Sequence, residues 1–210
     1  AGTLFDPEAF RAGKQTPVFF GSALNNFGVE PFLAALCDLA PPPSSRMTTS
    51  GLQAPTDEVF TGFVFKIQAN MDPNHRDRMA FVRVCSGRFE KDMQVFHTRL
   101  GRKIRMSRPH RLFARERETI DEAFPGDVIG LSNPGYFQIG DTLCEADLRM
   151  FDPIPRFQPE CFAVLRNVQI AKYKQFSQGI SQLEEEGVIQ VFYAPYQARR
   201  EPILAAVGVL

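Results

Sequence analysis

Residues 60–67 and 79–85 constrain the fold more than any other part of the sequence, because both have the alternating pattern of half-buried β-strands. Alternate positions in each are apolar: Phe63, Phe65 and Ile67 in the first segment, and Ala80, Val82 and Val84 in the second. A third strand is predicted at residues 94–98. The first two segments therefore predict an antiparallel pair with one face in a core.

The connection between these two strands, residues 68–78, is polar and charged. It contains the turn sequence Asp72-Pro73-Asn74, followed by His75-Arg76-Asp77-Arg78, which is too polar to bury. We therefore expect a loop that projects from the surface and is available for contact with another molecule or domain.

Residues 57–150 as a whole have the pattern of a small all-β domain. Short strand candidates recur there at close spacing, with no convincing helix between them. Turn sequences separate the strands: Ser86-Gly87, Pro125-Gly126-Asp127, Asn133-Pro134-Gly135 and Gly140-Asp141. We predict a closed antiparallel β-barrel, because closure removes the edges that such short strands would otherwise expose.

Two proline-containing segments divide the chain. Residues 41–56 begin with three prolines and two serines, and residues 151–159 contain Pro153, Pro155 and Pro159. Stiff, extended backbone followed by polar residues is typical of linkers between domains. The sequence therefore predicts a multidomain chain with units at residues 1–40, 57–150 and 160–210.

The unit at residues 1–40 combines a helical turn or two at 5–12, a strand at 16–20 and a helix at 29–39. One strand with one or two helices cannot close a core alone. We therefore expect this unit to be the end of an α/β domain. The chain does not begin with Met and stops in an apolar run, so we also expect it to be part of a longer protein.

The unit at residues 160–210 changes period along its length. It predicts a strand at 161–165, a helix through Tyr173 and Leu183 that stops near Gly187, and strands at 188–193 and 203–210. The order β-α-β-β is that of the first part of a ferredoxin-like domain. We expect a partial α+β unit of this type.

Charge is balanced over the chain but not along it. The 24 basic and 24 acidic residues cancel. From residue 99 to residue 117, however, eight cationic side chains face only one carboxylate, Glu116. The cations are Arg99, Arg102, Lys103, Arg105, Arg108, Arg111, Arg115 and Arg117. This stretch is either a solvated face or a footprint for RNA.

No motif in the chain predicts catalysis or metal binding. The sequence G-x-x-x-x-G-K-[ST] does not occur, the four cysteines include no C-x-x-C, and the three histidines lack further ligands at metal-binding spacing. Widely spaced cysteines suit reduced thiols in the cytoplasm. No long apolar run indicates a membrane span. The turn at residues 21–24 follows a strand candidate, and its small side chains would let the backbone approach a nucleotide base.

Several strings together carry a resemblance to a known family. Residues 124–131 and 139–143 (FPGDVIGL and IGDTL) are similar to the β-barrels of ribosomal translational GTPases. Residues 16–29 (TPVFFGSALNNFGV), 60–78 (FTGFVFKIQANMDPNHRDR) and 185–192 (EEGVIQVF) resemble the bacterial peptide chain release factor 3 family. The string QANMDPNHRDR is the most specific, because elongation factor G differs in that loop.

The resemblance implies an architecture: the end of a P-loop GTPase domain at 1–40, a translation-factor β-barrel at 57–150 and the start of a third domain at 160–210. Ser22, Ala23 and Leu24 match the family's fifth nucleotide motif, whose backbone contacts guanine. The phosphate loop, the magnesium-binding aspartate and the remaining base-recognition motif would precede Ala1. The resemblance thus implies a parent GTPase that uses GTP, GDP and Mg²⁺, whereas this fragment binds none of them and is inactive alone.

The resemblance also implies a role and partners. A release factor 3 is a monomeric cytoplasmic protein that acts on the ribosome after peptide release and promotes departure of class-I release factors. Ribosomal RNA, ribosomal proteins and class-I factors are then the partners, and no membrane is involved. His75, Arg76 and Arg78 are expected to contact ribosomal RNA or the GTP-binding domain, with an ion-paired structural loop as the alternative.

Two other functions stay open on the sequence. The chain could belong to an elongation factor G-like translocase, or residues 57–150 could be a stand-alone RNA-binding barrel that uses residues 99–117. One position departs from the family pattern: Asp92 stands where these barrels usually have glycine, so a turn with positive φ would be strained there.

Overall fold

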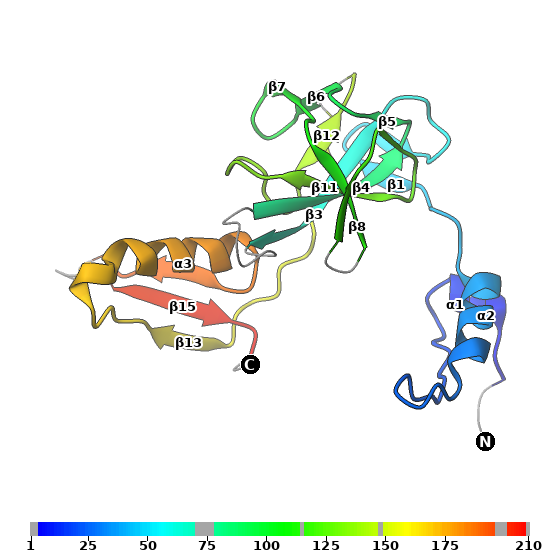
Figure 1. The fold of residues 1–210 in the computed structure, drawn as a ribbon, viewed down its shortest axis with the longest axis horizontal. Helices are drawn as coiled ribbons and strands as arrows, with labels where there is room; N and C mark the ends of the chain where they lie inside the picture. The colour runs from blue at the N-terminus through cyan, green and yellow to red at the C-terminus, as the bar shows by residue number, and fades with distance from the viewer. Residues whose placement is uncertain (1–3, 70–77, 114–115, 147–148, 196–200, 209–210) are drawn as a thin grey trace. The chain divides into compact units, whose positions relative to one another are not determined.

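The fold is that of a computed structural model, which describes residues 4–69, 78–113, 116–146, 149–195 and 201–208 (Figure 1). The chain divides into two compact units, residues 1–44 and 45–210. The second unit contains an eight-stranded sheet and, after it, a smaller three-stranded sheet with a helix.

The eight-stranded antiparallel sheet has the strand order β7-β6-β12-β3-β4-β11-β8-β9. At its centre β3 (Thr61–Ala69) and β4 (Arg78–Ser86) form the longest pair, as the alternating pattern predicts. The flanking strands are β6 (Gln94–His97), β7 (Arg102–Arg105), β8 (Pro109–Phe113), β9 (Glu116–Thr119), β11 (Val128–Ser132) and β12 (Thr142–Cys144).

This sheet is a curled half-barrel and not the closed barrel predicted from the sequence. Within the described residues its outer strands, β7 and β9, do not pair with each other. Instead β5 (Phe89–Glu90) and β10 (Glu122–Ala123) form a separate two-residue pair close in sequence to β6 and β9. With two residues per strand, this pair does not continue the ladder of the eight-stranded sheet.

The core lies on the concave side of the half-barrel. Its large, fully buried apolar side chains include Phe60, Phe89, Ile129 and Leu143, and Ala80, Val82 and Val84 join them as predicted. On β3 the prediction that Phe63, Phe65 and Ile67 share a face was wrong. A β-bulge between Val64 and Lys66 shifts the alternation by one residue.

The bulge redistributes the aromatic side chains of β3. Val64 and Ile67 lie in the main core, whereas Phe63 packs on Phe151 in a second cluster, with ring centroids 5.8 Å apart. Phe65 is 37% exposed. The other strain anticipated from the sequence is present: Asp92 has φ +67°, and its carboxylate pairs with Arg105 at 3.1 Å.

The segment predicted as a linker at residues 41–56 contains a hairpin. Strand β1 (Arg46–Thr48) pairs with β2 (Gly51–Gln53), and Thr48 forms an isolated bridge to Phe151. Gln53 is 2% exposed and donates to Ser86 at 3.0 Å. Part of the proline-rich segment is therefore packed against the half-barrel.

The C-terminal β-α-β-β unit has the predicted element order. Strand β13 (Cys161–Val164), a 3-10 turn (Ile170–Lys172), α3 (Tyr173–Glu185), β14 (Gln190–Tyr193) and β15 (Pro202–Ala206) follow one another. The sheet order is β13-β15-β14, with both pairs antiparallel. The last strand thus lies between the first two, which is the arrangement of a split βαβ motif. Gly187 has φ +74° just beyond the helix, as its predicted role as a stop requires.

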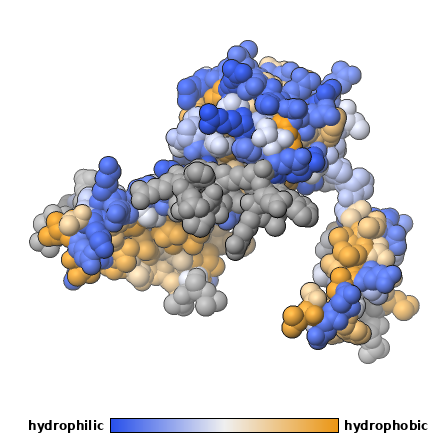
Figure 2. Space-filling model, in the orientation of Figure 1, coloured by the Kyte–Doolittle hydropathy of each residue, from blue (hydrophilic) through white to orange (hydrophobic). Residues whose placement is uncertain are grey.

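The N-terminal unit contains α1 (Pro7–Arg11) and α2 (Val29–Leu39), the second with the predicted bounds. The predicted strand at residues 16–20 was wrong, because the segment pairs with no described strand. Val18 is 73% exposed and Phe20 85%, and no described residue from 4 to 44 is buried. Figure 2 shows apolar residues at the surface of this unit. Its apolar segments have no core to enter within the unit.

Candidate functional site

The segment Ser22–Leu24 forms the tip of a tight turn that precedes α2. Ser22 and Phe27 exchange backbone hydrogen bonds of 2.9 and 3.0 Å, and the Asn26 amide donates to the Ala23 carbonyl at 3.3 Å. The amides of Ala23 and Leu24 donate to no described residue. Leu24 is 95% exposed. Two adjacent backbone donors are therefore accessible at the predicted nucleotide-contact position.

Two glycines allow this turn to form. A Cβ on Gly28, whose φ is +71°, would lie 2.5 Å from the Phe20 carbonyl oxygen. A Cβ on Gly21 would lie 2.9 Å from the Phe27 carbonyl oxygen. Both distances are shorter than van der Waals contact permits, so the close crossing of residues 20–21 and 27–28 depends on glycine.

The loop that the sequence singled out is described only at its margins. His75 and Arg76 lie outside the described residues. Arg78, at the start of β4, donates from Nη1 to Glu185 Oε2 at the end of α3. The amide of Ala69, at the end of β3, donates to Glu186 Oε1 at 2.6 Å. Both described ends of the loop thus bond to consecutive glutamates of the C-terminal unit.

The basic stretch at residues 99–117 is partly neutralised by the fold. Arg99 pairs with Asp141, Arg105 pairs with Asp92, and Arg102 lies 5.8 Å from the centroid of the Tyr136 ring. Lys103, Arg108 and Arg111 are exposed and form neither an ion pair nor a ring contact with any described residue. Arg115 lies outside the described residues. The positive field is therefore narrower than the sequence indicates.

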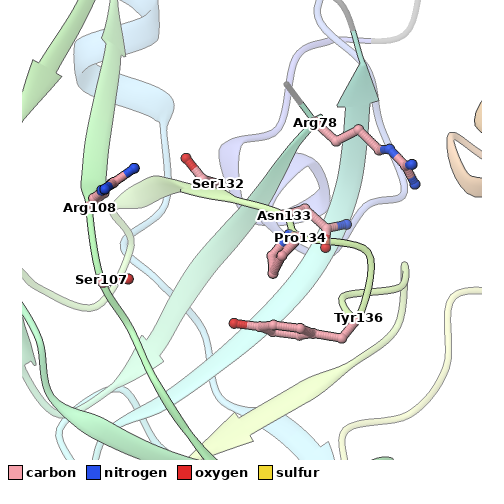
Figure 3. Close-up of a pocket in the computed structure, with 7 residues that line it drawn as sticks. All are labelled: Arg78, Ser107, Arg108, Ser132, Asn133, Pro134 and Tyr136. Carbon is pink, nitrogen blue, oxygen red and sulfur yellow. The ribbon is translucent and has the colours of Figure 1, made fainter. Parts of the chain in front are cut away.

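A polar notch of about 430 Å³ opens beside one of these free cations. Figure 3 shows its lining: Arg78 from β4, Ser107 and Arg108 from the turn between β7 and β8, Ser132 from the end of β11, and the turn at residues 133–136. No carboxylate lines the notch. Its donors are guanidinium and hydroxyl groups, so its chemistry favours an anion.

The turn that forms one wall of the notch is held by Asn133, which is 7% exposed. Its Oδ1 accepts from the amides of Gly135 at 2.8 Å and Phe137 at 3.1 Å, and its Nδ2 donates to the Phe137 carbonyl at 3.1 Å. Three of the four hydrogen-bonding directions of the side-chain amide are used. Asn133 is therefore a structural residue of the turn and not a free ligand.

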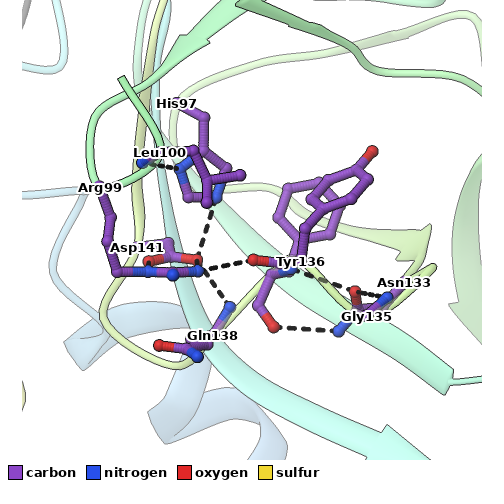
Figure 4. Close-up of polar contacts among 9 residues, drawn as sticks. His97, Arg99, Leu100, Asn133, Gly135, Tyr136, Gln138 and Asp141 are labelled. Carbon is purple, nitrogen blue, oxygen red and sulfur yellow. Dashed lines mark hydrogen bonds and ion pairs between the residues drawn. The ribbon is translucent and has the colours of Figure 1, made fainter. Parts of the chain in front are cut away.

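Asp141 holds the same turn through its contacts with neighbouring residues (Figure 4). This carboxylate, 3% exposed, accepts from the Gln138 amide at 2.6 Å and from Arg99 Nε at 2.6 Å, and it lies 3.0 Å from Nε2 of the buried His97. Arg99 Nη2 also donates to the Tyr136 carbonyl at 2.6 Å. The buried carboxylate thus holds the segment 136–138, directly at the Gln138 amide and through Arg99 at the Tyr136 carbonyl.

The ionisation of this cluster follows from its environment. Burial raises the pKa of the Asp141 carboxyl, but the contact with His97 at 3.0 Å and the hydrogen bonds from Arg99 and the Gln138 amide outweigh it, and the pKa lies below its ordinary value. Burial raises the pKa of the Tyr136 phenol, although Arg102 opposes the shift. At neutral pH Asp141 is therefore an anion, and Tyr136 is a neutral hydrogen-bond donor.

Sequence reasoning missed the notch and the Asp141 network. The turn Asn133-Pro134-Gly135 was identified only as a strand boundary, and Asp141 only as part of a family string. A buried carboxylate that meets an arginine 42 residues earlier has no local signal. The aromatic Tyr136-Phe137 pair directly after the turn was the one sequence feature that could have indicated a built surface.

No group of three or more His, Cys, Asp or Glu side chains in the described part of the chain could hold a metal ion. Among those same residues, no helix is long and apolar enough to cross a membrane.

Comparison with known proteins matches two family models to this chain. Elongation factor G domain 2 matches residues 59–146, and the class II release factor RF3 C-terminal domain matches residues 151–210. Peptide chain release factor 3 of Synechococcus elongatus and that of Gloeobacter violaceus are each 57% identical over 209 residues, and that of Synechocystis sp. is 55% identical over 210. The chain belongs to the peptide chain release factor 3 family.

The matches to this family cover the whole chain but only part of its members. The chain spans 38–39% of the length of these three curated relatives. The resemblance that the sequence strings carried is confirmed. The C-terminal match, which is to a release factor domain, favours this family over an elongation factor G-like translocase.

Proposed function

We propose that the complete protein containing this chain is a GTP-dependent release factor that acts on the ribosome in translation termination. It would promote dissociation of class-I release factors after the peptide has been released. The observation that carries this proposal is the identity of 55–57% to peptide chain release factors 3 along the entire chain. Its place of action is then the cytoplasm, and it works as a monomer.

The N-terminal unit would supply one contact of the guanine nucleotide. Residues 1–40 are then the end of a P-loop GTPase domain, and Ser22, Ala23 and Leu24 lie at its base-binding turn. The accessible amides of Ala23 and Leu24 support this, because backbone donors can bind the guanine carbonyl oxygen. The Ser22 amide is less suited, since it already donates to Phe27 at 2.9 Å.

GTP hydrolysis would require residues outside this chain. The chain contains no phosphate loop, so Mg²⁺ and the phosphates would be held by the remainder of the domain. We therefore expect residues 1–210 alone to have no GTPase activity. No catalytic residue is assigned within them.

The half-barrel and the C-terminal unit would connect nucleotide state to ribosome binding. Lys103, Arg108 and Arg111 are free cations on the half-barrel, and such residues suit ribosomal RNA phosphates. His75 and Arg76 are proposed as further contacts to ribosomal RNA or to the GTPase domain. Arg78 has a different partner in Glu185, which favours a structural role for that residue in this state.

The test is GTP hydrolysis by the complete gene product with and without ribosomes. We expect slow turnover alone and strong stimulation by ribosomes that carry a class-I release factor, together with faster departure of that factor. The chain of residues 1–210 is the negative control. Hydrolysis that ribosomes leave unchanged would refute the proposal. Stimulated translocation of tRNA would favour an elongation factor G-like role instead.

A further inference from the structure

We propose that the notch between Arg108 and Tyr136 binds a phosphate of an RNA strand, and that the bound phosphate takes Arg78 away from Glu185. RNA binding on the half-barrel therefore breaks a contact that the half-barrel makes with the C-terminal unit. The identity of the RNA as ribosomal rests on the proposed function, but the binding chemistry does not.

The lining of the notch carries the first part of this inference. Arg108 forms no ion pair with a described residue, and the hydroxyls of Ser107 and Ser132 form no hydrogen bond within that part of the chain. A neutral Tyr136 phenol adds a third hydroxyl donor. A guanidinium with hydroxyl donors and no carboxylate suits phosphate oxygens. A volume of about 430 Å³ exceeds what a bare ion needs, so the phosphate is carried on a larger group.

The backbone at Arg108 is the second observation. Its φ is +52°, in the left-handed region that non-glycine residues avoid. Pro109 follows and restricts Arg108 further, towards extended conformations. Strain of this kind persists where the surrounding structure enforces it, and it is concentrated at ligand clamps. Here it directs a cationic residue to the rim of the notch.

The bonding of Arg78 supports the second part of the inference, that a bound phosphate takes Arg78 away from Glu185. Figure 3 shows its guanidinium turned away from Arg108, while its side chain still lines the notch. The Arg78–Glu185 pair is partly exposed, with side-chain exposures of 28% and 27%. An ion pair of that exposure contributes little net free energy, whereas a phosphate can accept two parallel hydrogen bonds from arginine. The phosphate and Glu185 thus compete for one cation.

Competition of this kind is reciprocal. If RNA weakens the Arg78–Glu185 pair, then removal of the carboxylate strengthens RNA binding. Glu185→Gln removes the charge and keeps the shape of the side chain. Glu184→Gln is the matched control, because Glu184 is exposed, adjacent and without an ion pair. The control measures the general effect of deleting one negative charge.

The experiment uses the 210-residue chain and a fluorescently labelled decamer of uridine, with binding followed by anisotropy over a range of salt. Arg108→Ala is expected to reduce the slope of log affinity against log salt by about 0.7, the value for one phosphate on a single strand. If the wild type and the variant bind equally at about 1 M salt, this difference in slope makes the variant bind roughly eight-fold more weakly at about 50 mM salt. Lys103→Ala, which removes a free cation outside the notch, is expected to change affinity less.

Glu185→Gln is expected to tighten RNA binding by roughly two- to five-fold, the most that a partly exposed ion pair can hold back. For Glu184→Gln, the change in the logarithm of the RNA affinity is expected to be less than half of the change for Glu185→Gln. Far-UV circular dichroism of each variant verifies folding. Equal effects of the two glutamine variants would overturn the coupling, and wild-type affinity in Arg108→Ala would overturn the site.

A last arm distinguishes the source of the phosphate. Guanosine monophosphate is added as a competitor of the labelled decamer. We expect it to compete poorly, since the strand contributes further phosphates, and competition equal to that of unlabelled RNA would overturn the assignment to a strand. No arm includes GTP or ribosomes, so these outcomes are independent of the test of the proposed function.

Discussion

Replacing Asp141 by Asn should destabilise the half-barrel by about 3 kcal/mol at neutral pH. Asparagine keeps an acceptor for the Gln138 amide, so that hydrogen bond contributes little to the difference. Arg99 is 38% exposed, and loss of its ion pair costs about 0.5–1 kcal/mol. The fully buried His97 lies 3.0 Å from the same Oδ2 that accepts from Gln138, so it would keep an oxygen neighbour but lose the charge on it, which costs about 1.5–3 kcal/mol. The sum lies between about 2 and 4 kcal/mol.

The same substitution has a defined pH dependence. The pKa of Asp141 is lower in the folded chain than its ordinary value of 3.8. The unfolded chain therefore binds the proton more tightly, and the carboxylate stabilises the fold fully only above that ordinary value. The stability difference between the wild type and Asp141→Asn should be constant at neutral pH. It should shrink as the pH falls below about 4 and through the pKa of the folded state.

Native-state hydrogen exchange measures this difference best. The chain contains two compact units, so a single unfolding transition cannot be assumed for it. Exchange in peptides that cover residues 94–100 and 136–144 reports the local free energy of opening. Asp121→Asn is the matched control, since Asp121 is 86% exposed and pairs with Lys91 at 3.1 Å. Equal protection in the two variants, or a difference that does not shrink as the pH falls below about 4, would refute the reasoning.

Two further substitutions test the turn and the core. Gly28→Ala in the complete protein should weaken guanine nucleotide binding roughly ten-fold, as strain of 1–3 kcal/mol implies, because a Cβ would lie 2.5 Å from the Phe20 carbonyl oxygen. Gly13→Ala has the same φ of +71° and open space around it, so titration with a fluorescent nucleotide should find it unchanged. Phe60→Ala should cost about 3–5 kcal/mol in the local opening free energy measured by hydrogen exchange, because the side chain is 0% exposed. Phe124→Ala, at 49% exposure, should cost less than about 1 kcal/mol. Equal costs for the two phenylalanines would contradict the assigned core.

Local patterns predicted the elements whose stability depends on their own residues. Helical spacing with a proline near the start located α2 at Val29–Leu39. Alternation located β3 and β4, and a glycine indicated the end of α3. By contrast, residues 16–20 have strand-forming side chains but no partner strand. A strand requires hydrogen bonds to another segment, so its own sequence could not decide it.

Details within correctly predicted elements also escaped the sequence. With the bulge between Val64 and Lys66, Val64 and Ile67 both lie in the core, whereas Phe63 lies in the second cluster. A one-residue shift of register reverses every later side chain, and nothing in the alternation itself indicates where the shift occurs. The open ladder between β7 and β9 is another property of pairing and not of composition.

The sequence alone determined the family, the order of the elements and the absence of a phosphate loop from the chain, because each is carried by contiguous residues. Only the tertiary structure decided which charges are free. It joined Arg99 to Asp141 across 42 residues and Arg78 to Glu185 across 107, and it left Arg108 unpaired at the notch. Charge pairing depends on distance in space, and chain separation does not encode it. The binding surface therefore became visible only once the chain was folded.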